Sequence, residues 1–197
     1  MRRRTFDALA TVAGLILTAV LVVAGVLLVW GHSYANNQVT SQLSAQKIVF
    51  PTTNSPEFKI LPAVNRAEMG KYAGQLMTNG AQAEVYANYF IGRHLFLIGG
   101  GKTYSQLSGE ALAQPKNLAL QDQVETVFKG TTLRSMLLEA YGFWTFGQIA
   151  LIAAIASFIA AALMLILSIF GFVHLRRTTP EAEILPKVAT RVVTNVS

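Results

Sequence analysis

Two long stretches without a charged residue lie near the ends of the chain, one at 8–30 and the other at 141–175. A helix that crosses a bilayer needs about 20 predominantly apolar residues, and both stretches exceed that length. Arginines at 2–4 precede the first stretch, and Arg176 and Arg177 follow the second. Because Lys and Arg concentrate in the cytoplasmic flanks of spanning helices, the pattern predicts two transmembrane helices with both termini in the cytoplasm.

This pattern places the protein in the cell (plasma) membrane and divides the chain into five parts. We expect a cytoplasmic N-terminus at 1–7, transmembrane helices at 8–30 and 141–175, an extracytoplasmic helical domain at 31–140, and a cytoplasmic tail at 176–197. The tail is polar and contains two prolines, and chain ends of this kind are poorly ordered unless something ties them down. We therefore expect the tail to be disordered.

The first stretch could instead be a signal peptide that is cleaved near Ala35, because Ser33-Tyr34-Ala35 resembles a small-x-small cleavage site. The apolar core of a secretory signal is usually about 7 to 15 residues long. Here the core is 8–30, which is longer than that range. The length favours an uncleaved signal anchor.

Helical spacing predominates between the two stretches, so the predicted fold class is an all-α membrane protein. Apolar periodicity extends the first helix to about Gln46, and prolines at 51, 56 and 62 then mark an extended loop. Helical spacing resumes near Arg66 and is expected to end at Asn79-Gly80, a favourable C-cap. The segment 81–98 is apolar on most sides, which predicts a buried central helix.

Turn and cap residues divide the rest of the outer segment. The glycines at 99–101 end the central helix, Thr103 begins a short helix, and Asn117 can cap another that ends at Gly130. Thr131 or Thr132 would then cap the longest helix, which continues into the second span. A helix of roughly 45 residues would be about 65 Å long. The second span is therefore expected to be continuous with a long outer helix.

Small residues recur at helical spacing in both apolar stretches. They are Ala10, Gly14 and Thr18 in the first stretch and Gly147, Ala150, Ala154, Ser157 and Ala161 in the second. Small residues let helix backbones approach closely in lipid, where packing replaces the hydrophobic driving force. The stripes predict packing between the two spans or between copies of the protein. The alternative is that Ala and Gly are simply common in spanning helices.

Charge and composition narrow the function. The 197 residues carry a formal charge of +6, and seven of the sixteen basic residues lie in the two terminal segments. The excess charge is thus mainly a topology signal, and we expect no nucleic-acid partner. The chain has no cysteine, which excludes disulfides, thiol catalysis and thiolate metal sites. A glycine-x-serine-x-glycine nucleophile motif is also absent, so we expect a protein that is not an enzyme.

One small polar site can be considered within the outer domain. Arg93 and His94 could combine with Glu84 or Glu110; the alternative is a helix histidine that is satisfied by an ordinary hydrogen bond. A metal site built on several imidazoles needs them to converge, whereas the other two histidines, at 32 and 174, are predicted on opposite sides of the bilayer. We therefore expect no metal and no cofactor.

The segment Leu95–Thr103 resembles a phosphate-binding loop, with three glycines followed by Lys102. The Walker pattern requires a glycine five residues before Gly101, and that position is Phe96. The segment is also predicted outside the cell, where nucleoside triphosphates are scarce. A helix terminator followed by an N-cap at Thr103 explains the sequence better, and we expect no nucleotide partner.

A set of short segments spread along the chain carries a family resemblance. The segments are Phe50-Pro51, Leu61-Pro62, Tyr72-Ala73-Gly74-Gln75, Asn79-Gly80-Ala81-Gln82-Ala83-Glu84-Val85-Tyr86-Ala87, Gly101-Lys102-Thr103-Tyr104-Ser105, Leu137-Leu138-Glu139-Ala140-Tyr141 and His174-Leu175-Arg176-Arg177. In these segments the chain resembles an uncharacterised actinobacterial two-span membrane protein family, and the resemblance covers 2–177. It implies two spans around an outer helical domain and no established activity. Some members have a name that refers to aromatic ring-opening dioxygenases. The residues here do not support that name, because a two-histidine, one-carboxylate iron site needs a second histidine near His94.

Together these features favour a non-catalytic binding or scaffolding role in the cell envelope, as an accessory subunit or a homo-oligomer. The expected partners are the lipid bilayer and either another membrane protein or a second copy. An alternative is an extracytoplasmic ligand sensor, which would signal through a partner because a tail of about twenty residues is too short for a signalling domain. An envelope enzyme that uses Arg93, His94 and a nearby glutamate is a third hypothesis.

Overall fold

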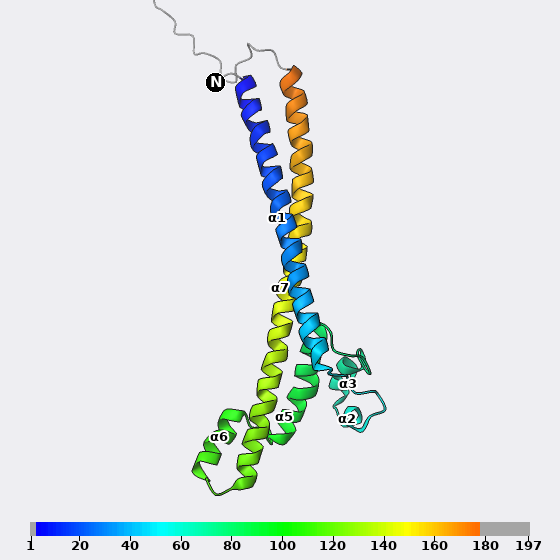
Figure 1. Cartoon of the computed structure of the whole chain (residues 1–197), viewed down its shortest axis with the longest axis vertical. Helices are drawn as coiled ribbons and strands as arrows, with labels where there is room; N and C mark the ends of the chain where they lie inside the picture. The colour runs from blue at the N-terminus through cyan, green and yellow to red at the C-terminus, as the bar shows by residue number, and fades with distance from the viewer. Residues whose placement is uncertain (1–2, 178–197) are drawn as a thin grey trace, which may run out of the picture. The chain divides into compact units, whose positions relative to one another are not determined.

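The computed structural model describes residues 3–177, with side chains from Thr5 onward. This part of the chain is helical and contains no strand beyond a single bridge between Val49 and Leu76, so the predicted all-α class is confirmed for it. The elements are α1 (Arg3–Gln46), α2 (Pro56–Lys59), α3 (Ala63–Gly70), α4 (Gly80–Val85), the π-helix η1 (Tyr86–Ile91), α5 (Gly92–Ile98), α6 (Tyr104–Ala113) and α7 (Leu118–Arg177) (Figure 1). The tail that we expected to be disordered lies, from residue 178 onward, outside the described residues.

Two of these helices, α1 and α7, are long and apolar enough to cross a membrane. Only 17% of the most apolar part of each is buried within the structure, whereas an apolar core helix of a soluble protein would be mostly covered. The chain forms two compact units. Unit 1 contains α1 up to Val29 and α7 from Ile152, and unit 2 is Trp30–Leu151.

Helix α7 begins earlier than its sequence suggests. Asn117 caps it, because its side-chain oxygen accepts from the Leu120 N–H at 3.2 Å, but the predicted stop at Gly130 and the new cap at Thr131 or Thr132 are wrong. The helix runs uninterrupted from Leu118 to Arg177. A Cβ at Gly130 would lie 2.5 Å from Leu95 Cδ2, so this glycine permits close helix packing and does not end the helix.

The segment before α4 also differs from the prediction. Helix α3 ends at Gly70, a turn follows, and residues 74–77 then pair with 48–50: the Met77 N–H donates to Ile48 O at 2.8 Å. Asn79 is therefore an N-cap and not part of a C-cap. Its side-chain oxygen accepts from the Gln82 N–H at 3.0 Å and starts α4. Backbone pairing with a distant segment overrode the local helical pattern.

The predicted buried helix at 81–98 is half correct. Its first part, α4 and η1, buries Ala83, Val85, Ala87 and Ile91. The second part, α5, buries none of its residues, and three consecutive apolar side chains, Phe96, Leu97 and Ile98, are exposed. The prediction of burial is therefore wrong for α5.

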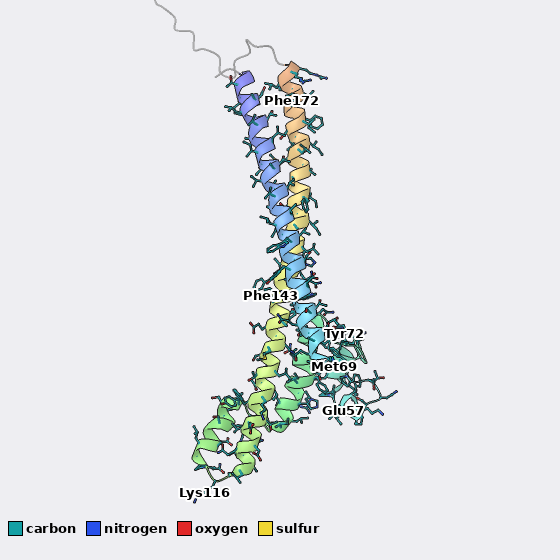
Figure 2. All side chains as sticks on the ribbon, viewed as in Figure 1. Glu57, Met69, Tyr72, Lys116, Phe143 and Phe172 are labelled. Carbon is teal, nitrogen blue, oxygen red and sulfur yellow. The ribbon has the colours of Figure 1, made fainter. Side chains whose placement is uncertain are left out.

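The main core of unit 2 surrounds Phe50, whose side chain is 1% exposed. Its ring lies 5.4 Å from the Tyr72 ring and 5.3 Å from that of Tyr86, and Met69 and Met77 are fully buried in the same cluster. Figure 2 labels Met69 and Tyr72 in this part of unit 2. Burial raises the pKa of Tyr86 above its ordinary value. The folded state therefore binds this proton more tightly than the unfolded state does. As a result, the free energy of unfolding falls as the pH rises through about 10 and above.

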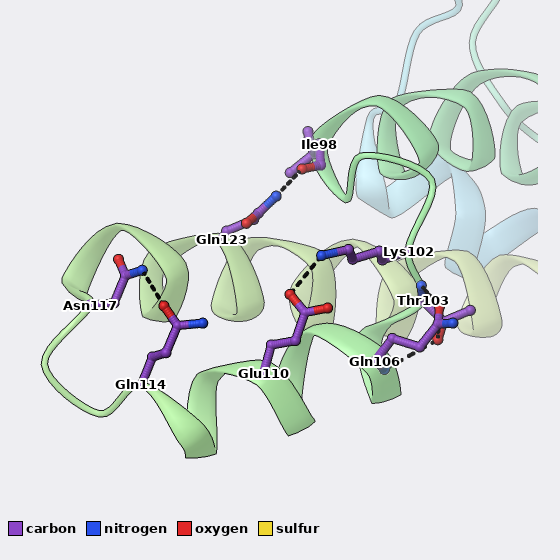
Figure 3. A network of polar contacts seen from close by, with 8 residues as sticks. All are labelled: Ile98, Lys102, Thr103, Gln106, Glu110, Gln114, Asn117 and Gln123. Carbon is purple, nitrogen blue, oxygen red and sulfur yellow. Dashed lines mark hydrogen bonds and ion pairs between the residues drawn. The ribbon is translucent and has the colours of Figure 1, made fainter.

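A second, smaller core joins α6 to the start of α7 through Leu107, Ala111, Leu120 and Val127, and Figure 1 shows α6 folded back beside this part of α7. The predicted cap at Thr103 is confirmed: it forms a capping box with Gln106. Lys102 follows the glycine turn, and its Nζ donates to Glu110 Oε2 at 2.6 Å (Figure 3). The lysine of the phosphate-loop resemblance thus pairs with an acid of α6.

Candidate functional site

An open groove lies between the parts of α1 and α7 that belong to unit 2 and has a volume of about 800 Å³. Tyr34, Gln38, Val39, Gln42, Leu43, Gln46 and Ile48 line one side, and Leu133, Met136, Leu137, Glu139, Ala140, Gly142, Phe143 and Phe146 line the other. Figure 2 labels Phe143 on α7. Binding pockets of this size are usually lined by apolar and aromatic side chains with a few polar groups, as this groove is.

The groove has a buried floor and exposed walls. Val39, Leu43 and Leu137 form the floor and belong also to the main core. The walls include Met136, which is 61% exposed, and Phe146, which is 72% exposed. Contiguous exposed apolar surface marks interaction sites in many proteins. The floor is thus fixed by the fold, while the walls lack a covering element from unit 2.

Three glutamines follow one edge of the groove. Gln38, Gln42 and Gln46 recur every fourth residue on α1 and are exposed. Residues four apart lie about 6 Å apart along one helix face, so the side chains form a row. Glu139 is the charged residue among those that line the groove.

The polar site considered from the sequence has its members in different settings. His94 Nδ1 lies 2.8 Å from Phe90 O, and its ring is 4.4 Å from the Phe90 ring. The Arg93 guanidinium lies over Phe96, 5.4 Å from the ring centroid, and its Nε is buried without a hydrogen-bond partner. Glu84 accepts from Asn88 Nδ2 at 2.7 Å. No hydrogen bond or ion pair found among the described residues joins Arg93, His94 and Glu84 to one another.

A different polar connection does cross unit 2. Arg134 of α7 donates from Nη2 to Asn88 Oδ1 at 2.8 Å and from Nε to Ala87 O at 3.3 Å, and Asn88 in turn donates to Glu84. The Ala87 carbonyl also accepts the Gly92 N–H, five residues on, as a π-helical bond. This connection holds η1 against α7. The sequence missed Arg134, because only the fold brings it beside a residue 46 positions away.

The packing residues predicted for the two apolar stretches fall in both units. In unit 1, a Cβ at Gly14 would lie 2.3 Å from Ser168 Oγ, Ser157 donates to Leu21 O at 2.8 Å, and Ala154 and Ala161 are buried. Ala10 is exposed, Ala150 is half-buried, and Thr18 donates to Gly14 O of its own helix. In unit 2, a Cβ at Gly147 would lie 3.0 Å from Ala35 Cβ, and the Gly147 carbonyl lies 2.9 Å from His32 Nδ1.

A second, smaller pocket of about 240 Å³ lies in unit 1, where Asp7 and His174 meet. Asp7 Oδ2 is buried without a hydrogen-bond partner and lies 3.8 Å from His174 Nε2. Thr11 and Ser168 add two buried hydroxyls. Sequence reasoning missed this pairing, although Asp7 directly precedes the first apolar stretch. Across the described residues, no group of three or more His, Cys, Asp or Glu side chains could hold a metal ion.

Comparison with protein-family models, with curated proteins and with solved structures found no significant match for this chain.

Proposed function

We propose that this chain is an integral membrane protein of the cell envelope with a non-catalytic binding or scaffolding role, as an accessory subunit or a homo-oligomer. The groove between α1 and α7 carries the proposal. Its apolar walls are exposed in unit 2, and burying apolar surface stabilises a complex by about 25 cal/mol per Å². A partner that covers Leu133 and Met136, the exposed wall residues in the outer segment, would therefore be favoured.

The proposed membrane placement has both apolar stretches spanning the plasma membrane, both termini in the cytoplasm and 31–140 outside. It is supported by the low burial of the apolar parts of α1 and α7 and by the arginines that flank them. The resemblance to the actinobacterial two-span family implies the same topology. Most of the groove would then be on the outer side, since its lining residues at 34–48 and 133–140 lie in the outer segment, whereas Gly142, Phe143 and Phe146 would lie at the outer end of the second span.

Thiol labelling tests this topology, and the absence of native cysteine makes single-cysteine variants unambiguous. We expect Lys116→Cys, in the exposed turn between α6 and α7, to react in intact cells with a membrane-impermeant maleimide. Thr178→Cys should react only after the cells are permeabilised. The reverse pattern would contradict the proposed orientation, and equal labelling of both variants in intact cells would show that the stretch 141–175 does not separate them across the membrane.

Crosslinking tests the groove as a binding surface. In native membranes, Met136→Cys treated with a short bifunctional thiol-to-amine or thiol-to-thiol reagent should give a protein adduct, because Met136 lies in the groove wall and is 61% exposed. The readout is the mass of the adduct on a denaturing gel, followed by mass spectrometry of its components.

The matched control is Thr131→Cys, five residues earlier on the same helix and also exposed. Five residues rotate a helix position by about 140°, and Thr131 does not line the groove. We expect its adduct to be much weaker, because a thiol on that side of α7 points away from a partner that sits in the groove. Equal adduct yields from the two positions would mean that the adducts form by random collision, and this result would contradict the proposal.

A further inference from the structure

We propose that Asp7 of α1 and His174 of α7 form a pH-sensitive latch, which joins the ends of the two apolar helices when His174 is protonated and releases them when it is neutral. The latch lies in unit 1 and is separate from the groove, which lies in unit 2. In the proposed membrane orientation this end of α1 and α7 faces the cytoplasm, so the latch responds to the pH of that compartment.

The geometry of the pair is that of two charges and not of a hydrogen bond. Both residues line the pocket of about 240 Å³ in unit 1. Asp7 Oδ2 lies 3.8 Å from His174 Nε2, which is within reach of an ion pair but too long for a hydrogen bond. Asp7 Oδ2 is also buried and accepts no hydrogen bond from the described residues. The attraction between the two side chains is therefore Coulombic, and it depends on the charge of His174.

Close packing one turn further along the helices brings the pair together. Thr11 follows Asp7 by four residues, and Gly171 precedes His174 by three, so each lies on the same helix face as the nearby member of the pair. A Cβ at Gly171 would lie 2.7 Å from Thr11 Oγ1, which shows how closely α1 and α7 approach at this level. Neither Thr11 nor Gly171 has a charge that changes with pH. The helix ends beyond this contact are thus the part that the charge of His174 can close or open.

Asp7 and His174 differ in their access to water. The Asp7 side chain is 19% exposed and the His174 side chain is 55% exposed, so His174 exchanges protons with the solvent while the carboxylate is mostly shielded from it. A shielded charge is costly unless an opposite charge pairs with it. When His174 loses its proton, Asp7 loses this pairing, and separation of the helix ends lets water reach Oδ2. The carboxylate therefore drives the opening of the latch.

His174 is the group of this pair whose charge changes near neutral pH. Histidine ordinarily gains or loses its proton between about pH 5 and 8, whereas an aspartate carboxyl ordinarily stays ionised above about pH 5. The other charged residues that the structure describes at this end of the two helices are Arg3, Arg4, Arg176 and Arg177. Arginine keeps its charge throughout this range. The latch is therefore closed at low pH, and its contribution to stability is lost as the pH rises.

Distances between spin labels in the full-length protein test the latch, and the absence of native cysteine permits labels at chosen positions. Thr5→Cys and Val173→Cys are exposed positions on α1 and α7, and labels there report the helix ends in lipid nanodiscs by double electron–electron resonance. We expect a narrow distribution of short distances at about pH 5 and a broader distribution of longer distances at about pH 8. The control pair, Val20→Cys and Leu163→Cys, is also exposed but lies further into the apolar stretches. Its distribution should be the same at both pH values.

Substitutions of the pair identify the groups responsible. His174→Ala should give the broad distribution at both pH values, because the carboxylate then has no cation at this position. His174→Lys should give the narrow distribution at both, because lysine keeps its charge throughout this range. Asp7→Asn should give one distribution at both pH values, because it removes the carboxylate that drives opening.

The lysine variant keeps the test decisive if a neutral variant folds poorly, because it retains the ion pair and should lose only the pH dependence. A wild-type distribution that does not change with pH would overturn the inference. A pH dependence that persists in His174→Ala or His174→Lys would overturn it as well, because another group would then control the helix ends.

Discussion

Replacing Phe50 by alanine should lower the free energy of unfolding of unit 2 by about 3–5 kcal/mol, as expected for removal of a fully buried aromatic side chain. Phe50 is 1% exposed and contacts the rings of Tyr72 and Tyr86. Its backbone is held on both sides as well: its N–H donates to Gln75 O at 2.9 Å, and its carbonyl accepts from the Gly74 N–H at 3.1 Å. The neighbours are thus fixed, and the cavity cannot collapse readily.

Amide hydrogen exchange of the full-length protein in detergent measures this loss, because it reports the free energy of opening for each region. Protection should fall in η1 and α3, which flank Phe50 in the core. Ile60→Ala is the control, since Ile60 is 63% exposed and its truncation should change protection by less than about 0.5 kcal/mol. Equal effects of the two substitutions would mean that Phe50 is not the centre of the core.

Replacing Gly80 by alanine should destabilise unit 2 by about 3 kcal/mol, although the change adds only one methyl group. A Cβ at Gly80 would lie 2.5 Å from Trp144 Cβ and 2.7 Å from its Cγ. Atoms this close to the backbone of α7 cannot move aside by a rotamer change, so α4 and α7 must separate. Overpacking of this kind costs up to about 3 kcal/mol. The effect is measurable as a lower denaturation midpoint followed by tryptophan fluorescence.

Gly109→Ala provides a control with the opposite sign. Gly109 lies within α6, and a Cβ there would meet nothing within 4 Å. Because glycine is less favourable than alanine inside a helix by about 0.8–1.0 kcal/mol, this substitution should stabilise the protein slightly. If Gly80→Ala were as harmless as Gly109→Ala, the close packing of α4 on α7 would be wrong.

Local signals in the sequence predicted much of the fold. The continuation of the first helix to Gln46, the caps at Thr103 and Asn117, and the two long apolar helices are confirmed. Each of these features depends on residues within a few positions of one another, where helical periodicity and capping act directly. The membrane orientation and the role of the small residues remain predictions from the same signals.

The two wrong predictions about helix ends have a common cause, which is contact with a distant residue. Gly130 was expected to stop a helix, but it accommodates Leu95. Asn79 was expected at a helix end, but it begins α4 because the segment before it pairs with 48–50. Glycine and asparagine suit several backbone environments, so local sequence could not decide between them.

The candidate site depended on tertiary structure even more strongly. The groove joins residues 34–48 to 133–146, which lie far apart in the sequence, and Arg134 reaches Asn88 across 46 positions. The one feature of the groove that is visible in the sequence is the four-residue spacing of Gln38, Gln42 and Gln46. Without a facing helix, that row would be an ordinary solvated helix surface.

By itself, the sequence determined that the chain is helical and that two of its helices are long and apolar enough to cross a membrane, because length, hydropathy and capping are properties of neighbouring residues. The tertiary structure alone decided which faces of α1 and α7 are covered and which are open. That choice depends on where η1 packs and on side chains such as Phe50 and Trp144, which meet their partners only after the chain has folded.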